Sequence, residues 1–223
     1  MGKEEDIKTR ALQKIIVDLR MNHAEEIDKA YAYFWDENSP DEFLAGTALE
    51  LGFINFEDWL VFDWKATGEE KTFLDLYLSN QSDLPDEERR VLSRIRDSVL
   101  SLYEVTSVSR DKRVLVKDIL LSDEHSLRNR MLTRGLKKGD IFATRILDLD
   151  DGPAMSGCVY PYRREDRKKV LSYIDKQFGR YKRNVRADGT MRDFLKDYGD
   201  VFNIVWLTFI QNHAKDGQES GPA

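Results

Sequence analysis

The chain has 223 residues, of which 34% are charged and 41% are apolar, and its net charge is −6. This acidic balance excludes an overall basic field that would attract nucleic acid or anionic lipid, and the aromatic content of 11% excludes a wholly disordered chain. No apolar run approaches the roughly 20 residues of a membrane span, and the acidic start MGKEEDIKTR is unlike a signal peptide. We therefore expect a soluble, cytoplasmic protein.

The first part of the chain, residues 1–101, is predicted to be helical because its apolar residues recur at helical spacing. A soft break is expected near Asn22. Ser39-Pro40-Asp41-Glu42 has the pattern of a capping box, which predicts the start of a helix that ends at Gly52. The predicted helices cover residues 4–35, 39–52, 54–66 and 70–79 and the stretch that starts at Asp83.

At Leu102 the apolar period changes from that of a helix to the alternation of a strand. Asp151-Gly152 predicts the tip of a hairpin. Strands are predicted in LYEVTSVS, RVLVKDILLS, the weaker HSLRNRML, LKKGDIFATRILDL and AMSGCVYPY. Five short strands with tight turns favour a bent antiparallel meander or small barrel over residues 102–162.

Helical spacing returns after residue 162 and predicts C-terminal helices over residues 163–213, which pack on the rest of the chain. The last of them is predicted as one continuous apolar helix from Thr190 onward. The polar residues 214–223 predict a disordered tail. Because the strands are grouped and not interleaved with helices, the predicted fold class is α+β. It comprises a helical N-terminal region, a central antiparallel bent sheet or small barrel of about five strands, and C-terminal helices.

Three segments resemble a known group of proteins. F-x-x-W-x-x-F-D at Phe56–Asp63, L-Y-E-V at Leu102–Val105 and G-D-x-x-x-x-R-I-L at Gly139–Leu147 are similar to uncharacterised prokaryotic proteins over roughly residues 50–160. Many members of that group carry a SEC-C zinc motif, a small Cys-rich C-terminal element that contacts partner proteins. With Cys158 as its one cysteine, this chain has no such motif. The resemblance therefore implies a fold and no activity.

No pattern of catalytic residues is found, so we predict neither catalytic residues nor a cofactor. The three histidines, His23, His125 and His213, are scattered along the chain, and no G-x-S-x-G elbow is present. Cys158 stands among strand residues, where a buried, inert thiol is favoured over a nucleophile. Gly135 and Gly139 lack the residue order of a phosphate loop and predict a turn.

The acidic segment LDLDDG invites a calcium interpretation, because it holds Asp148, Asp150 and Asp151. It lacks the downstream bidentate Glu of an EF-hand loop. Solvated residues at a hairpin tip are the favoured interpretation, and we predict no metal site.

The best candidate for a binding surface is a basic stretch over residues 163–186. Cations at a helix N-terminus oppose the helix dipole, which hints at contacts with an external anion such as a phosphate. A solvated helix face, or one docked against the acidic N-terminal helices, is the favoured alternative. The candidate residues are Arg163, Arg164, Arg167, Lys168, Lys169, Arg180, Lys182 and Arg183.

A second candidate is the aromatic and acidic patch of Trp59, Asp63 and Trp64. Helical spacing explains most of its aromatic residues, so a packing seam is favoured over a ligand site. Asp63 stands between Phe62 and Trp64. Its carboxylate must be exposed, cap the following turn, or pair with a cation such as one from the basic stretch.

The leading functional hypothesis is a non-catalytic binding or adaptor protein whose ligand or protein partner is open. The alternative is an RNA- or DNA-binding protein that uses the strand meander and the basic 163–186 face. Exposed Tyr or Phe beside those cations would favour nucleic acid. An enzyme, the least favoured class, would require a cleft that gathers Asp63 or another acid with Arg145 or a His. No membrane partner is expected, and the oligomeric state is left open.

Overall fold

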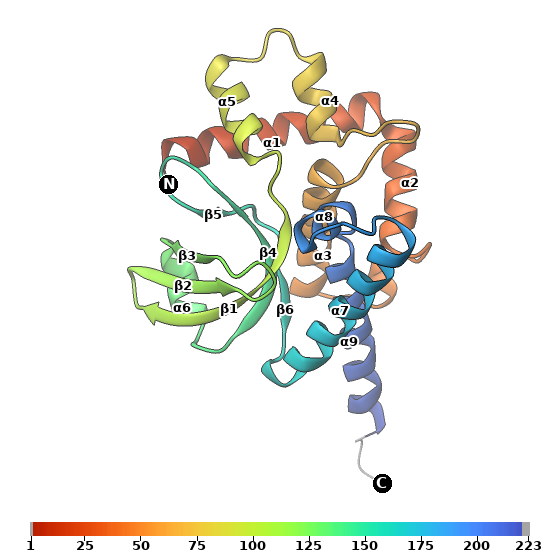
Figure 1. Cartoon of the computed structure of the whole chain (residues 1–223), viewed down its shortest axis with the longest axis vertical. Helices are drawn as coiled ribbons and strands as arrows, with labels where there is room; N and C mark the ends of the chain where they lie inside the picture. The colour runs from red at the N-terminus through yellow and green to blue at the C-terminus, as the bar shows by residue number, and fades with distance from the viewer. Residues whose placement is uncertain (1, 220–223) are drawn as a thin grey trace.

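The structure is a computed structural model that describes residues 2–219, with side chains described for residues 2–211. It confirms the α+β class: helices pack around a curled antiparallel sheet (Figure 1). The helices before the sheet are α1 (Lys3–Asn22), α2 (Ala24–Phe34), α3 (Thr47–Phe62), α4 (Phe73–Asn80) and α5 (Asp86–Ile95), with a short 3-10 turn, η1 (Pro40–Glu42). None of the helices within the described residues is long and apolar enough to cross a membrane.

The break predicted near Asn22 is confirmed, because α1 ends at Asn22 and α2 starts at Ala24. One face of α1 is buried through residues spaced four apart, namely Ile7, Ala11, Ile15 and Leu19. This helix lies across α4 and α5 at the top of the molecule (Figure 1). α1 also contacts α3, which runs through the centre of the fold (Figure 1).

The helix predicted from Ser39 to Gly52 is wrong. Ser39 makes no capping bond to the backbone and donates instead to Asp41, so only the turn η1 forms there. α3 starts later, after Gly46, whose φ of +54° suits glycine. It then passes straight through Gly52, where a Cβ would lie 2.9 Å from the Trp35 ring. Gly52 therefore permits close packing and does not end a helix.

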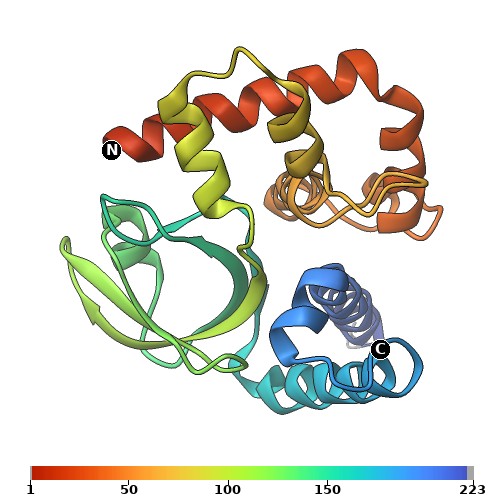
Figure 2. The same cartoon turned by 45° about the horizontal axis from the view of Figure 1, so that its top comes forward.

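The sheet is antiparallel throughout, in the order β3-β2-β1-β4-β5, with β6 also paired to β4. It curls into a half-barrel (Figure 2). A small apolar cluster that includes Tyr103, Val105 and Phe142 packs between its strands. The strands are β1 (Leu100–Ser109), β2 (Arg113–Asp118), β3 (Glu124–Leu127), β4 (Ile141–Leu147), β5 (Ala154–Met155) and β6 (Tyr160–Tyr162).

The predicted strand HSLRNRML is correct only in its first residues. β3 ends at Leu127, and α6 (Arg130–Gly135) follows. The reason is local: the Asn129 carboxamide oxygen accepts hydrogen bonds from the backbone N–H groups of Met131 and Leu132, which caps a helix.

The C-terminal region forms a turn and three helices: η2 (Arg164–Asp166), α7 (Arg167–Asn184), α8 (Met191–Asp197) and α9 (Val201–Glu219). They lie together beside the half-barrel (Figure 2). The continuous helix predicted from residue 190 onward is broken at Gly199, which packs against Asp63. α9 runs through the first part of the predicted disordered tail, 214–223, and residues 220–223 lie outside the described residues. The predicted divisions at residues 101 and 162 stay predictions.

Replacing Gly199 with Ala is expected to destabilise the protein by about 1–3 kcal/mol, because overpacking strains a filled interior. The new Cβ would lie 2.7 Å from Asp63 Oδ2. Gly179→Ala is the matched control: it sits inside α7, where its Cβ meets only the end of the flexible Arg183 side chain at 3.4 Å. The control should be neutral or stabilising by up to about 1 kcal/mol. Urea unfolding measures both, and equal effects would contradict this account.

Asp200, just before α9, is 7% exposed and accepts a hydrogen bond from the Tyr33 hydroxyl. Burial raises its pKa to about 6, and the hydrogen bond from Tyr33 opposes the rise. Because the pKa of Asp200 is higher in the folded protein than in the unfolded chain, folding favours the protonated carboxyl. The stability that Asp200 contributes is therefore complete below its pKa of about 4 in the unfolded chain, and it is lost as the pH rises through 6.

Asp200→Asn removes this titration. The stability of the variant relative to wild type should therefore increase by about 2–3 kcal/mol between pH 4 and pH 7. Urea unfolding at a series of pH values measures the difference. Asp175→Asn, which replaces an exposed carboxylate on α7, is the matched control for the substitution itself. A flat difference for both variants would show that Asp200 titrates as an ordinary surface acid.

Candidate functional site

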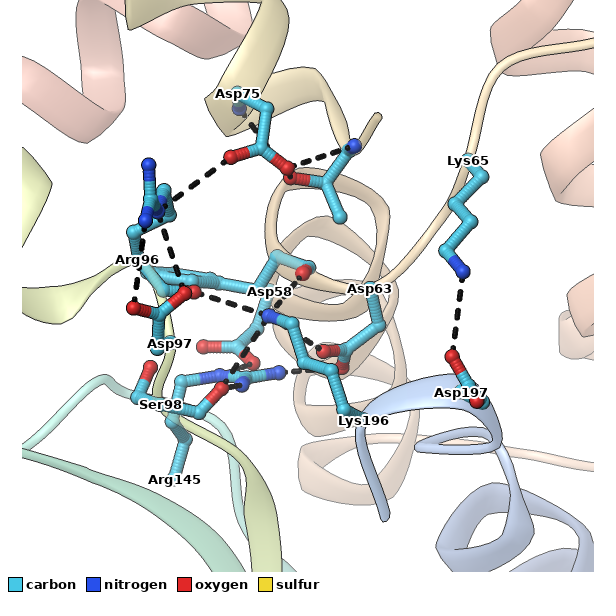
Figure 3. A network of polar contacts seen from close by, with 12 residues as sticks. Asp58, Asp63, Lys65, Asp75, Arg96, Asp97, Ser98, Arg145, Lys196 and Asp197 are labelled. Atoms are coloured by element: carbon cyan, nitrogen blue, oxygen red, sulfur yellow. Dashed lines mark hydrogen bonds and ion pairs between the residues drawn. The ribbon is translucent and has the colours of Figure 1, made fainter. Parts of the chain in front are cut away.

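A buried arginine stands at the centre of the molecule. Arg145 lies on β4, its side chain is fully buried, and its guanidinium reaches three partners (Figure 3). Nε donates to Asp58 Oδ1 at 2.9 Å, and Nη2 donates to Asp63 Oδ2 at 2.5 Å. Nη1 donates to the Ser98 carbonyl at 2.6 Å, and the Phe62 ring covers the guanidinium carbon at 4.5 Å. One side chain thus joins the sheet to α3 and to the start of β1.

The charges of this network depend on one another. Burial alone would lower the pKa of Arg145, but the carboxylates of Asp58 and Asp63 outweigh it and raise that pKa. Burial raises the pKa of Asp63, and the opposing charges of Arg145 and Lys196 hold the rise back. Asp63 therefore pairs with a cation, one of the three outcomes expected for its carboxylate, but the cation comes from the sheet and not from the basic stretch.

α8 closes the network from the other side through Lys196. Its Nζ lies 3.7 Å from Asp63 Oδ1 and donates to the carbonyls of Phe62 and Arg96, at 2.8 and 3.0 Å. Burial lowers the pKa of this lysine, and Asp63 counteracts the shift. Further out, Arg96 pairs with Asp97, at a site exposed to solvent (Figure 3). Such exposed pairs contribute about 0–1 kcal/mol, so the buried centre dominates.

The structure thus brings Asp63 and Arg145 together, as an enzyme of unrecognised type would require. Neither residue lines any of the five most prominent pockets of the described residues. Trp59 is buried and stacks on Tyr33 with ring centres 5.9 Å apart, while Trp64 is half-buried against Trp59. The aromatic and acidic patch is packed as a seam between helices.

A groove lies on the other side of Asp58, between α1, α3 and the loop that joins β5 to β6. Its volume is about 550 Å³. Asp58, whose side chain is 7% exposed, forms part of its wall while it holds Arg145. The lining is Lys8, Thr9, Leu12, Gln13, Ile16, Val17, Arg20, Ile54, Glu57, Asp58, Val61, Phe62, Ser156 and Cys158. The buried network therefore fixes one wall of an otherwise largely apolar groove.

Lys8 is the unusual group in this lining. It is only 5% exposed, and its ammonium makes no hydrogen bond and no ion pair within 4 Å to any described residue. Burial lowers its pKa, and the more distant charges of Glu5 and Asp58 oppose the shift. A buried charge without a close partner is costly, so it marks a place where a ligand can add one.

Ser156 and Cys158 complete this end of the groove. The Ser156 hydroxyl donates to Cys158 Sγ at 3.3 Å, a weak bond that leaves the hydroxyl free to turn toward a ligand. Burial raises the pKa of the Cys158 thiol, and the charge of Asp58 raises it further. The thiol stays protonated at neutral pH and is a poor nucleophile. Cys158 is buried, as expected, but it lies in the loop between β5 and β6 and not in a strand.

The acids at the predicted hairpin tip have structural partners. Asp151 Oδ2 accepts from the backbone N–H of Glu4 at 2.9 Å, and the Glu4 carboxylate accepts from the backbone N–H of Asp150 at 2.6 Å. Arg94 bridges the Glu4 and Asp150 carboxylates at 3.0 and 2.5 Å. The tip thus clasps the start of α1. No group of metal-ligating side chains gathers anywhere in the described part of the chain.

The predicted basic surface is partly used within the fold. Arg164 pairs with Asp140 at 2.7 Å, and Arg167 pairs with Glu104 at 3.3 Å, so both tie the start of α7 to the sheet region. Lys169 lies 3.4 Å from Asp166 in the adjacent turn. The other candidates are exposed and form no ion pair with any described residue: Arg163, Lys168, Arg180, Lys182 and Arg183.

The aromatic residues of the half-barrel are not available to stack on bases. Tyr103, Phe142, Tyr160 and Tyr162 are all at least nine-tenths buried. The exposed aromatic residues beside cations that would favour nucleic acid are therefore missing from these strands. The basic surface itself stays a prediction.

The chain belongs to a family of unknown function, DUF7986, whose model matches residues 14–198. No curated protein and no solved structure matches the chain. Membership of an uncharacterised family agrees with that part of the sequence resemblance, and nothing links this family to the SEC-C motif. The matched span contains the whole buried network, whereas Lys8 lies before it.

Arg145→Met should destabilise the protein by about 3–5 kcal/mol, because it leaves two buried carboxylates without their cation. Arg96→Met is the control. It removes an exposed arginine from the same region and should cost less than about 1 kcal/mol. Adding Asp58→Asn and Asp63→Asn to Arg145→Met should recover part of the loss. Urea unfolding measures each variant, and similar losses from the two arginine variants would contradict a buried, interdependent network.

Proposed function

We propose that this protein is a non-catalytic binding protein that holds an elongated, largely apolar small molecule in the groove between α1 and α3. The groove carries the proposal. Its volume of about 550 Å³ lies within the range of about 300–1,000 Å³ that ligand pockets occupy. Apolar atoms make up most of the surface that the groove exposes, although seven of its fourteen lining residues are polar or charged. A mainly apolar surface with some polar groups is the usual composition of such pockets.

The dimensions of the groove favour a chain-like ligand. The lining extends along α1 from Lys8 to Arg20, about 18 Å at 1.5 Å per residue. A groove of this length suits an extended chain.

The mouth of the groove is apolar and open to solvent. Val17 on α1 is 55% exposed and Ile54 on α3 is 44% exposed, and both belong to the lining. Exposed aliphatic side chains beside a hollow give up water when a ligand covers them, which favours binding of an apolar molecule.

The polar groups of the groove favour binding over catalysis. No histidine belongs to the lining. The Cys158 thiol is held protonated, and the Asp58 carboxylate is engaged by Arg145, so neither is an activated nucleophile or base. The nucleic-acid alternative has only the exposed cations of α7 in its favour, on a protein whose net charge is −6.

A neutral fluorescent probe, N-phenyl-1-naphthylamine, should bind to the wild-type protein with an increase in emission. Ile54→Trp places an indole at the mouth and should weaken this binding at least 10-fold while thermal unfolding stays unchanged. Met21→Trp is the matched control, because Met21 lies on α1, is 78% exposed and does not line the groove. Binding that survives in Ile54→Trp, or no binding to wild type, would overturn the proposal.

A further inference from the structure

We propose that the ligand of the α1–α3 groove carries one negatively charged head group, such as a carboxylate, which pairs with Lys8. This inference rests on the proposed function, because it assigns the chemistry of one end of the same ligand. The ligand is then an amphipathic monoanion with an aliphatic body. Lys8 lies before the family-matched residues 14–198, so the head-group preference is proposed for this chain and not for the whole family.

The first argument is that Lys8 lacks a close partner. Its side chain is on the groove wall and 5% exposed, yet its ammonium has no acceptor within hydrogen-bonding or ion-pair distance among the described residues. By contrast, the buried Arg145 has three acceptors, and the half-buried Lys196 donates to two backbone carbonyls, those of Phe62 and Arg96. An anion at Lys8 would supply the missing acceptor through a charge-assisted hydrogen bond.

The second argument is the local balance of charge. Asp58 acts on both Lys8 and Arg145, but its hydrogen bond goes to Arg145, at 2.9 Å. Lys8 therefore has no carboxylate within pairing distance among the described residues. Glu5, one turn before Lys8, acts on it only from beyond ion-pair distance. A single negative charge on the ligand would balance this end of the groove, whereas a dianion would bring repulsion from Asp58.

The third argument is the arrangement of polar groups along the groove. Ser156 bonds Cys158, and both Cys158 and Lys8 are influenced by the charge of Asp58, so these groups share one end. At the other end Arg20 already pairs with Glu57 at 2.7 Å, with both side chains well exposed. Only the Lys8 end offers an unsatisfied charge, so it orients the ligand head inward and the apolar body along α1.

The test compares decanoate with decanol, two chains that differ in head group, by displacement of N-phenyl-1-naphthylamine. Wild type should bind decanoate at least 10-fold more tightly than decanol. Lys8→Met keeps the apolar stem and removes the charge, so it should lose that preference while its affinity for decanol stays within twofold. Lys14→Met is the matched control: it removes an exposed lysine of the same helix that pairs with Glu88 and should preserve the preference.

The outcomes separate the two proposals. If the neutral probe and decanol bind but decanoate has no advantage, the head-group inference is wrong and the groove still binds apolar ligands. If the neutral probe, decanol and decanoate all fail to bind, both the proposed function and the head-group inference are wrong. Tighter binding of decyl phosphate as a dianion than of decanoate would overturn the single-charge argument.

A measurement on the unmodified protein protects the test against misfolding of Lys8→Met. The decanoate affinity of wild type should decline as the pH rises, and it should do so at a lower pH than an ordinary lysine would give, because burial lowers the pKa of Lys8. The decanol affinity should not change over the same range. A decanoate affinity that is flat until the ordinary lysine range would contradict pairing with Lys8.

Discussion

The fold depends on the burial of one positive charge. Arg145 sits on a central strand with no exposed surface, and its guanidinium is retained there only because two carboxylates and a carbonyl surround it. Stability alone does not require an arginine in this position, since replacing a whole buried ion network with apolar residues is often neutral or stabilising. The network instead fixes the orientation of α3 relative to the sheet. The guanidinium is planar and its N–H groups donate in fixed directions, so it defines this orientation more closely than an apolar contact would.

This orientation extends to the groove through Asp58. One oxygen of its carboxylate is held by Arg145, while the residue also forms part of the groove wall. The groove therefore has a wall whose charge is already neutralised, next to a lysine whose charge is not. A wall fixed by the core, as opposed to a mobile loop, keeps the shape of the groove constant in the absence of a ligand. Preorganisation of this kind reduces the ordering that binding requires.

The sequence predicts the parts of this architecture that depend on nearby residues. The spacing of Ile7, Ala11 and Ile15 is enough to predict α1, and Asp151-Gly152 is enough to place a hairpin tip. It fails where distant contacts decide. Gly52 resembles a helix end until Trp35 is found against it, and Gly199, between α8 and α9, lies where a Cβ would clash with Asp63. In both cases a glycine is required by a neighbour far away in the chain.

The site was harder to predict for the same reason. Asp58 and Arg145 are 87 positions apart, and no local pattern pairs them. Lys8 did leave a signal, because it shares a helical face with Leu12 and Ile16, four and eight positions later, where an apolar residue would be expected. A lysine in such a row is usually read as a side chain that reaches water. Only the packed structure reveals that most of its side chain is covered and that its ammonium has no close counter-charge among the described residues.

The hydrogen bonds and ion pairs between the start of α1 and the hairpin tip also affect the order of folding. Glu4 and Asp150 are 146 positions apart, and the loop that their contact closes contains most of the groove's walls. Closing so long a loop is entropically costly, so contacts of this kind form late, after local helices and hairpins exist. During synthesis, residue 4 leaves the ribosome long before residue 150 is made. The Lys8 end of the groove is therefore among the last features to be assembled, and until then α1 can dock only through its other contacts, chiefly those with α5.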